Sequence, residues 1–179
     1  MLSVRVLMSH YLRRSRMRSV KRSSVFGKLM YSSIIQLEHQ FQTNVFGLVA
    51  TIQTVLPILR QQGGGIIVNV ASVGGRLALP LTSSYHTTKW SVEGLSESIR
   101  YELRRFNIQV KIIEPDGIKT NFIDRGTAWT SHPHYADLVE RVKWFNEELN
   151  NSLPGPEGVA KIIYRAANDR SSEPLCRLT

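Results

Sequence analysis

Runs of apolar residues, separated by glycine and proline, divide this chain into alternating helices and strands. The segment Ile66–Ala71 is almost wholly apolar and follows three glycines, which predicts a turn and then a strand buried on both faces. A second strand is predicted over Ile108–Glu114, where an apolar run ends at a proline. Helices are predicted over about Ile34–Arg60 (bent or interrupted near Pro57), Ser84–Arg105, Tyr135–Asn150 and Pro156–Asn168. This alternation indicates an α/β fold with a parallel sheet.

The predicted helix Ser84–Arg105 has one clearly apolar side. The side chains that should face the core recur at intervals of three and four residues: Val92, Leu95, Ile99 and Leu103. The remaining faces of this helix are therefore left for solvent or for a site.

Candidate chemistry begins on the same helix with Tyr85 and Lys89. Positions four apart share a helix face, so the ammonium would lie beside the phenol, favour the phenolate and lower the phenol pKa from about 10. Ser72 follows a predicted parallel strand, at the end where α/β folds place their chemistry, and would hold a reacting oxygen by hydrogen bonding. The spacing alone is weakly specific, because Tyr-x-x-x-Lys occurs by chance in about a third of chains of this composition. A surface helix pair, with Ser72 as a strand-end cap, is the alternative.

Four short motifs place these residues in a wider pattern. The segment from Gln42 to Phe122 resembles the short-chain dehydrogenase/reductase family in the order, spacing and identity of these motifs, and the resemblance extends more loosely from about Phe26 to Asp169. The motifs are Thr43-Asn44-Val45-Phe46-Gly47, Val68-Asn69-Val70-Ala71-Ser72, Tyr85-His86-Thr87-Thr88-Lys89 and Pro115-Asp116-Gly117-Ile118-Lys119-Thr120. The resemblance implies a partial doubly wound (Rossmann-like) parallel sheet with flanking helices.

The resemblance also implies roles for individual residues. Ser72 would bind the substrate oxygen, Tyr85 would be the acid or base, and Lys89 would lower the tyrosine pKa and hold the nicotinamide ribose. Asn44 would support a water relay to the lysine, with a plain helix residue bonded to backbone as the alternative. The residues that would contact NAD or NADP are Asn44, Tyr85, Lys89, Pro115, Gly117, Ile118 and Thr120. No metal ligand is expected, and His86 is expected to face solvent.

The implied activity is hydride transfer between a nicotinamide and a small-molecule alcohol or carbonyl compound. The family also pairs the helices that carry Asn44 and Tyr85 with those of a second subunit, so a homo-oligomer is expected. The substrate cannot be read from the sequence, because the family's specificity lies in the loop around Ile118 to Tyr135 and in pocket shape. The choice between NAD and NADP cannot be read either.

Two features depart from the family pattern. The family opens with a strand and a glycine-rich turn that binds the coenzyme pyrophosphate, but here Gly63–Gly65 precede a strand, and Gly74-Gly75 precede a stretch where no helix can begin cleanly. Asp116 also stands where the family has glycine, which should weaken cofactor binding. We therefore expect a truncated domain with the later half of such an enzyme. A non-catalytic remnant, acting as an interaction subunit or through a basic arm, is the alternative.

Positive charge is concentrated at the start of the chain. Residues 1–22 hold seven of the 23 Lys and Arg and no Asp or Glu, whereas the other 157 residues hold 16 basic against 14 acidic ones. We expect residues 1–25 to be a basic appended segment outside the fold, and residues 26–179 to form the domain. An altered gene start, an organellar transit peptide and a basic arm that attracts nucleic acid or acidic membranes all stay open. No specific nucleic-acid partner is expected.

Composition sets the broad class. The chain is 42% hydrophobic over 179 residues with no apolar run near the length of a membrane span, which is typical of one soluble globular domain. Cys176 is the only cysteine, so an intramolecular disulfide is excluded and the reducing cytoplasm is the expected location.

Overall fold

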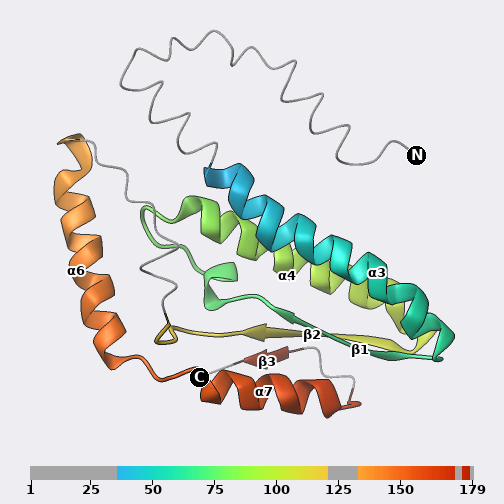
Figure 1. Ribbon diagram of the computed structural model, residues 1–179. Coiled ribbons are helices and arrows are strands. Elements are labelled where there is room, and N and C mark those ends of the chain that lie inside the picture. Colours follow the sequence, from blue (N-terminus) through green and yellow to red (C-terminus); the bar gives the residue numbers. More distant parts are fainter. Residues whose placement is uncertain (1–35, 121–132, 172–174, 178–179) are drawn as a thin grey trace, which may run out of the picture. The chain divides into compact units, whose positions relative to one another are not determined.

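The computed structural model describes residues 36–120, 133–171 and 175–177 (Figure 1). The chain divides into two compact units, Met1–Gln36 and Leu37–Thr179, and the described residues belong almost wholly to the second. The predicted basic segment 1–25, its boundary at residue 26 and most of the predicted specificity loop lie outside the described residues.

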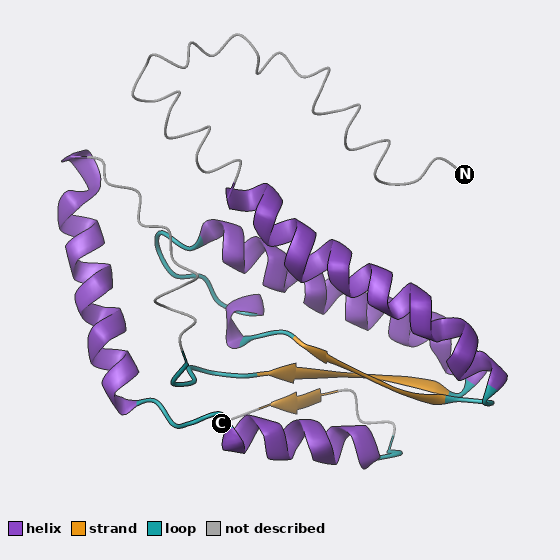
Figure 2. Ribbon diagram, viewed as in Figure 1, coloured by secondary structure: helices purple, strands orange, loops and turns teal. Residues whose placement is uncertain are grey.

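A parallel sheet forms the centre of the second unit (Figure 2). Its strands are β1 (Gly65–Val70), β2 (Ile108–Glu114) and β3 (Leu175–Arg177), in the order β1-β2-β3. The register pairs Gly65 with Ile108 and Val70 with Ile113. Both predicted strands are confirmed to within one residue. The short strand β3 was not predicted, because three residues give no readable periodicity.

Helices of the described residues follow the predicted ranges closely. They are α3 (Gly47–Gln61), α4 (Ser83–Leu103), α6 (Ala136–Ser152) and α7 (Glu157–Asn168), with short 3-10 helices at Val73–Gly75, Arg104–Phe106 and Pro133–Tyr135. A π-helical turn at Gln42–Phe46 precedes α3. The predicted interruption at Pro57 is wrong, since α3 runs through this residue. Pro57 and Gln53 are exposed, so water can satisfy the Gln53 carbonyl that loses its helical partner.

Helices cover both faces of the sheet, with α3 and α4 on one face and α7 on the other (Figures 1 and 2). The main core cluster lies between α3, α4 and the sheet and contains Ile52, Ile67, Leu103, Ile108 and Val110. The predicted stripe of α4 is confirmed, with its first and last members buried and the two between them half-buried. These neighbouring parallel strands with helices on both faces confirm the α/β, Rossmann-like class.

Burial of β1 is one-sided, which corrects the prediction of a strand buried on both faces. Ile67 and Asn69 are buried against α3 and α4, whereas Ile66 and Val68 are half-buried and Val70 is 44% exposed. In the described part of the chain, the short helix α7 is what packs against that second face. A run of apolar letters cannot show how much of a face its neighbours will cover.

One helix of the described residues, Gln36–Gln61, is long and apolar enough to cross a membrane by length and composition, with a mean hydropathy of 1.3. This contradicts the expectation that no stretch approaches that length. Only 11% of the most apolar window of this helix is buried, with Ile52 in the core cluster.

Candidate active site

Ser72 begins the turn that follows β1. Its backbone is extended, and its Oγ accepts a hydrogen bond of 3.0 Å from the Gly74 amide, so it caps the short helix Val73–Gly75. The same hydroxyl lies 3.5 Å from the Pro115 carbonyl oxygen, and the Val73 amide donates to that carbonyl at 3.0 Å. The cap expected as an alternative for Ser72 is therefore present, and it places the hydroxyl between the ends of β1 and β2.

Tyr85 and Lys89 lie one turn apart near the start of α4, and both are half-buried. The Ser72 side chain is close enough to the Tyr85 phenol to lower the phenol pKa by hydrogen bonding. The Lys89 ammonium donates to the Val70 carbonyl at 3.2 Å, and its Nζ lies 5.7 Å from the centroid of the Tyr85 ring. A β-carbon built on Gly74 would approach the Tyr85 ring to 3.0 Å, so glycine lets the turn lie directly against the phenol. The structure thus brings Ser72, Tyr85 and Lys89 together.

Ionisation of the Tyr85–Lys89 pair differs from the expectation drawn from spacing. Burial raises the pKa of Tyr85 above its ordinary value of 10.0, and the hydrogen bond with Ser72 opposes this rise. Burial lowers the pKa of Lys89, while the Glu93 carboxylate opposes the fall. The net shift of the phenol pKa is therefore opposite in direction to the expected one. Partial burial penalises the phenolate, and the ammonium is bonded to a strand carbonyl.

Asn44 lies in the π-helical turn and reaches α4 through its side-chain amide. Its Nδ2 donates to Gln40 Oε1 at 2.8 Å and to Thr88 Oγ1 at 3.0 Å, and Thr88 is completely buried beside Lys89. The alternative of a side chain bonded to backbone is not the arrangement observed. Asn44 instead fixes the helix Gln36–Gln61 against the turn of α4 that carries the lysine.

The loop after β2 holds the other predicted cofactor contacts. Pro115 is buried, Gly117 and Ile118 are half-buried, and Thr120 is exposed at the end of the described segment. The Asp116 carboxylate accepts a 2.8 Å hydrogen bond from the Gly117 amide. The backbone donor at Gly117 is therefore already engaged by a negative charge, and the weaker cofactor binding expected from Asp116 stays a prediction.

His86 was expected to face solvent, and that expectation is wrong. The side chain is 7% exposed, and its Nε2 accepts a 2.8 Å hydrogen bond from the Leu79 amide. Since Nε2 is the acceptor, Nδ1 carries the proton and donates to the Gly74 carbonyl at 2.8 Å. His86 therefore ties the loop after the Ser72 turn to α4. The hydrophobic pattern of α4 could not reveal these two hydrogen bonds, because both partners of His86 lie before the helix begins.

Sequence reasoning missed a buried ionic cluster beside the site. Arg76 contacts Glu114 Oε1 at 2.8 Å and Glu93 Oε2 at 3.2 Å. Two features of the sequence could have indicated this cluster. Glu93 directly follows the core residue Val92 and lies one helical turn after Lys89. Glu114 ends an otherwise apolar strand. Charged residues at such core positions are rarely left unpaired.

No described residue forms a glycine-rich pyrophosphate turn. The amides of Gly64 and Gly65 donate to the carbonyls of Leu59 and Asn107, and Gly75 donates to the carbonyl of Ser72. These donors are used by the protein itself. Within the described ranges, no group of three or more His, Cys, Asp or Glu side chains could hold a metal ion.

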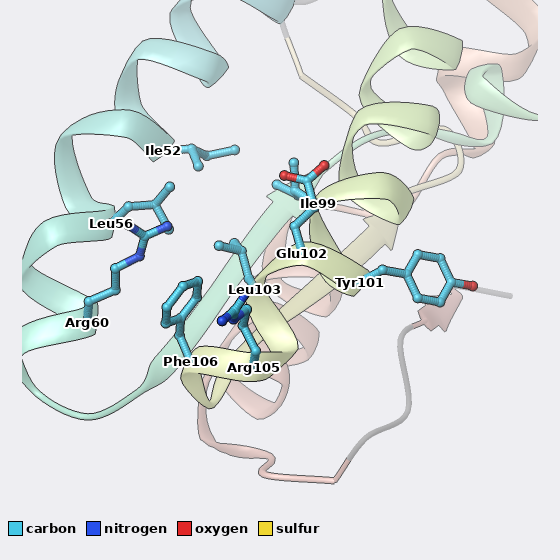
Figure 3. Close-up of a pocket in the computed structure, with 9 residues that line it drawn as sticks. All are labelled: Ile52, Leu56, Arg60, Ile99, Tyr101, Glu102, Leu103, Arg105 and Phe106. Atoms are coloured by element: carbon cyan, nitrogen blue, oxygen red, sulfur yellow. The ribbon is translucent and has the colours of Figure 1, made fainter.

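A separate hollow of about 500 Å³ lies between α3 and the end of α4 (Figure 3), whereas Tyr85 lies near the start of α4. Its floor is apolar, and Arg60 and Arg105 stack over the Phe106 ring, with guanidinium carbons 4.2 and 5.4 Å from the centroid. Tyr101 points outward at its rim (Figure 3). None of the predicted site residues lines this hollow.

Comparison with known proteins gives a consistent match. A family model described as short chain dehydrogenase matches residues 23–130. An uncharacterized oxidoreductase of Schizosaccharomyces pombe is 34% identical over 172 residues, which cover 96% of this chain and 72% of the relative.

Solved structures share the fold. A short-chain dehydrogenase from Streptomyces avermitilis matches with a TM-score of 0.67 and 33% identity, over 80% of this chain and 52% of that one. Two further structures share the fold at lower identity. A short chain dehydrogenase from Burkholderia cenocepacia in complex with NADP matches with a TM-score of 0.55 and 22% identity, over 78% of this chain and 48% of that one. A short chain dehydrogenase/reductase from Burkholderia phymatum in complex with NAD matches with a TM-score of 0.62 and 23% identity, over 76% of this chain and 51% of that one. The chain spans about half the length of these structures.

Proposed function

We propose that this chain, which belongs to the short-chain dehydrogenase family, carries the proton-transfer residues of an oxidoreductase that acts on an alcohol or carbonyl carbon. The observation that supports this most is the convergence of three side chains from two segments. Ser72 begins the turn that follows β1, and Tyr85 and Lys89 lie near the start of α4, with the Ser72 side chain acting on the phenol.

Each of these side chains has a defined task in the proposed reaction. The Ser72 hydroxyl holds the substrate oxygen, and the Tyr85 phenol exchanges a proton with that oxygen. The ordinary pKa of the Tyr85 phenol is 10.0 and burial raises it, so the phenol carries its proton at neutral pH and can donate it in carbonyl reduction. The Lys89 ammonium, one turn away, stabilises the phenolate that remains after the proton has left.

The cofactor in this proposal is NAD or NADP, which supplies or accepts the hydride when it is bound. The residues present fit its nicotinamide end: Lys89 offers an ammonium, Thr120 a hydroxyl, and Pro115, Gly117 and Ile118 a backbone segment beside the half-buried phenol. Asn44 contributes by holding the helix turn that carries Lys89. The sequence contains no turn that fits the pyrophosphate. The residues present therefore fit the nicotinamide end of the coenzyme but not its pyrophosphate.

The test uses a fusion protein in which the amino-terminal part of a family relative precedes Phe26, assayed with both coenzymes and a panel of small alcohols and ketones. Tyr85→Phe should lower turnover by roughly 100- to 10,000-fold, the usual contribution of a general acid. Tyr101→Phe is the matched control, because Tyr101 lies on the same helix and is 65% exposed. Turnover that survives Tyr85→Phe would assign the acid to another group, and a fusion without any turnover would favour the non-catalytic alternative.

Assembly into homo-oligomers belongs to the same proposal. The helix Gln36–Gln61 is apolar, yet only 11% of its most apolar window is buried, and Ile58 is 53% exposed. Apolar surface of this kind favours association. Light scattering coupled to size-exclusion chromatography should show a species larger than 20.3 kDa at micromolar concentration, and a monodisperse monomer would contradict this. Cytoplasmic location stays a prediction.

A further inference from the structure

Arg76 joins two carboxylates that the protein removes from water. Its guanidinium contacts Glu114 through both Nε and Nη2, each 2.8 Å from Oε1, and Nη2 also lies 3.2 Å from Glu93 Oε2. The two glutamate side chains are 9% and 4% exposed, whereas the arginine side chain is 47% exposed. One guanidinium thus pairs with both carboxylates, so the cluster is a concentrated feature rather than scattered surface pairing.

The two glutamates interact with each other as well as with Arg76. Burial, the Glu114 charge and a hydrogen bond with Glu114 raise the pKa of Glu93 to about 7, although Arg76 opposes the rise. Two nearly buried carboxyl groups that interact repel each other when both are ionised. Removing Arg76 would take away the guanidinium that contacts both of them, although their side chains are only 9% and 4% exposed.

Each member of the cluster belongs to a segment that carries part of the candidate active site. Arg76 directly follows the Ser72 turn, Glu93 lies one turn after Lys89 on α4, and Glu114 precedes Pro115. The contacts between these segments are close: a β-carbon built on Gly75 would lie 2.8 Å from Glu93 Cγ and 3.1 Å from the Lys89 carbonyl oxygen. A shift of the Ser72 turn relative to α4 would therefore break the cluster.

From this placement we propose that Arg76 is a positioning residue, which holds the Ser72 turn, the Tyr85 helix and the Pro115 loop in one arrangement through Glu93 and Glu114. Arg76 touches neither Ser72 nor Tyr85 in the contacts described above, so it acts through the two glutamates. The proposal deepens the proposed function, and rests on it for the role of Tyr85.

The test records two local signals in the full chain, neither of which needs turnover. The first is the NMR signal of Tyr85 in protein labelled at the tyrosine ¹³Cζ, assigned with Tyr85→Phe. The second is hydrogen exchange at the Val73 and Gly74 amides, which bond to Pro115 and Ser72. The variants are Arg76→Gln, Arg76→Lys and the control Arg100→Gln, whose arginine lies on α4 against Tyr101.

Arg76→Gln should move the Tyr85 signal and speed exchange at both amides by about tenfold or more, while the Ile67 and Val110 amides of the β1–β2 ladder keep their protection. Arg76→Lys should restore part of both signals, because one ammonium can bridge only part of the pair. Arg100→Gln should change neither.

An unchanged Tyr85 signal with unchanged exchange in folded Arg76→Gln would overturn the proposal. Equal loss of protection at the turn and in the strands would also overturn it, because Arg76 would then be a general stabiliser. If Arg76→Gln does not fold, Arg76→Lys provides the test. The proposal would then be rejected if the Tyr85 signal and the amide exchange of Arg76→Lys equal those of Arg100→Gln. Turnover that survives Tyr85→Phe would reject the proposed function but leave these two signals unaffected.

Discussion

Both ends of the β1–β2 pair have an apolar core cluster, and ionic and hydroxyl side chains gather beside the one at the carboxyl end. At the amino end, α3, α4 and the strands meet through Ile52, Ile67, Leu103, Ile108 and Val110, and the hollow of Figure 3 opens beside them. At the carboxyl end, the same elements meet through hydroxyls, a phenol, an ammonium and the cluster of Arg76, Glu93 and Glu114.

The difference shows where this fold accepts a cost in stability. Apolar contacts at the amino end stabilise the fold under all conditions. Buried ionic groups at the carboxyl end contribute little net stability and are sensitive to pH and to the loss of any one partner. Perturbed ionisable groups of this kind gather where chemistry is done. We therefore expect the amino end to control stability, and the carboxyl end to control turnover and pH dependence.

The largest expected effect belongs to Lys89. In the fusion protein, Lys89→Ala should lower kcat/KM by roughly 1,000-fold or more, with losses in both kcat and coenzyme affinity, because the ammonium serves the phenolate and the ribose together. Lys161→Ala, at an exposed position of α7, is the control and should change neither quantity. A Lys89→Ala protein that loses only coenzyme affinity would remove the lysine from the proton-transfer step.

A second prediction concerns coenzyme binding by the 179-residue chain itself. NAD and NADP should bind no more tightly than about millimolar, since a loss of about 4 kcal/mol already turns a micromolar site into a millimolar one. Two features carry this expectation: the sequence has no glycine-rich pyrophosphate turn, and the Asp116 carboxylate occupies the Gly117 amide. Calorimetric titration measures it, with Asp116→Ala expected to bind more tightly. A micromolar dissociation constant for the unaltered chain would mean that another segment binds the phosphates.

The third prediction sharpens the comparison at the apolar end. Leu103 is 4% exposed, and Leu103→Ala should lower the free energy of unfolding by about 2 to 5 kcal/mol through lost burial and a residual cavity. The loss should be the same at pH 5 and pH 8, because no ionisable group joins this core cluster. Tyr164→Ala is the control at a 72% exposed site of α7, where the change should stay within about 0.5 kcal/mol. Urea denaturation at both pH values provides the measurement.

The fourth and smallest effect is a pH-dependent one at Glu93. Its pKa is raised to about 7 in the fold from an ordinary 4.5, with Arg76, Glu114 and Glu97 as its charged neighbours, and Lys89 one turn away. The folded protein therefore holds a proton that the unfolded chain releases near pH 4.5. The stability contribution of this proton is present below that value and is lost as the pH rises through about 7.

Glu93→Gln removes this ionisation. The variant should match the unaltered protein near pH 5 and exceed its free energy of unfolding by about 1 kcal/mol at pH 8. Glu102→Gln is the control, because Glu102 lies on the same helix and is exposed. Equal stability differences at both pH values would show that Glu93 does not change its charge in this range.

Hydrophobic periodicity and the positions of glycine and proline predicted most of the helices and strands. The strand Ile108–Glu114 and the stripe of α4 were correct because each is long enough to show a pattern, and the strand ends at a proline. β3 was missed because it is three residues long, and the burial of β1 was overestimated because coverage of a face depends on elements distant in sequence. The π-helical turn at Gln42–Phe46 was also not predicted, because this segment contains no proline that would mark a change in the helix.

Motif spacing predicted which residues meet at the site but not how they ionise. Ser72, Tyr85 and Lys89 converge as the spacing requires, whereas the direction of the Tyr85 pKa shift depends on burial, which the letters do not show. His86 and the Arg76 cluster were missed for a related reason. Their partners are separated by as many as 38 residues, and such pairings become visible only once the chain has folded.

The central claim is that the Tyr85 phenol carries the proton transfer, while the apolar end carries stability. The most direct measurement compares Tyr85→Phe with Leu103→Ala in the fusion protein, recording kcat and Tm for both. The account predicts that Tyr85→Phe loses roughly 100-fold or more in kcat with a nearly unchanged Tm, and that Leu103→Ala loses several degrees in Tm with kcat of the folded protein preserved. A Tyr85→Phe protein that retains more than about a tenth of its turnover would contradict the account.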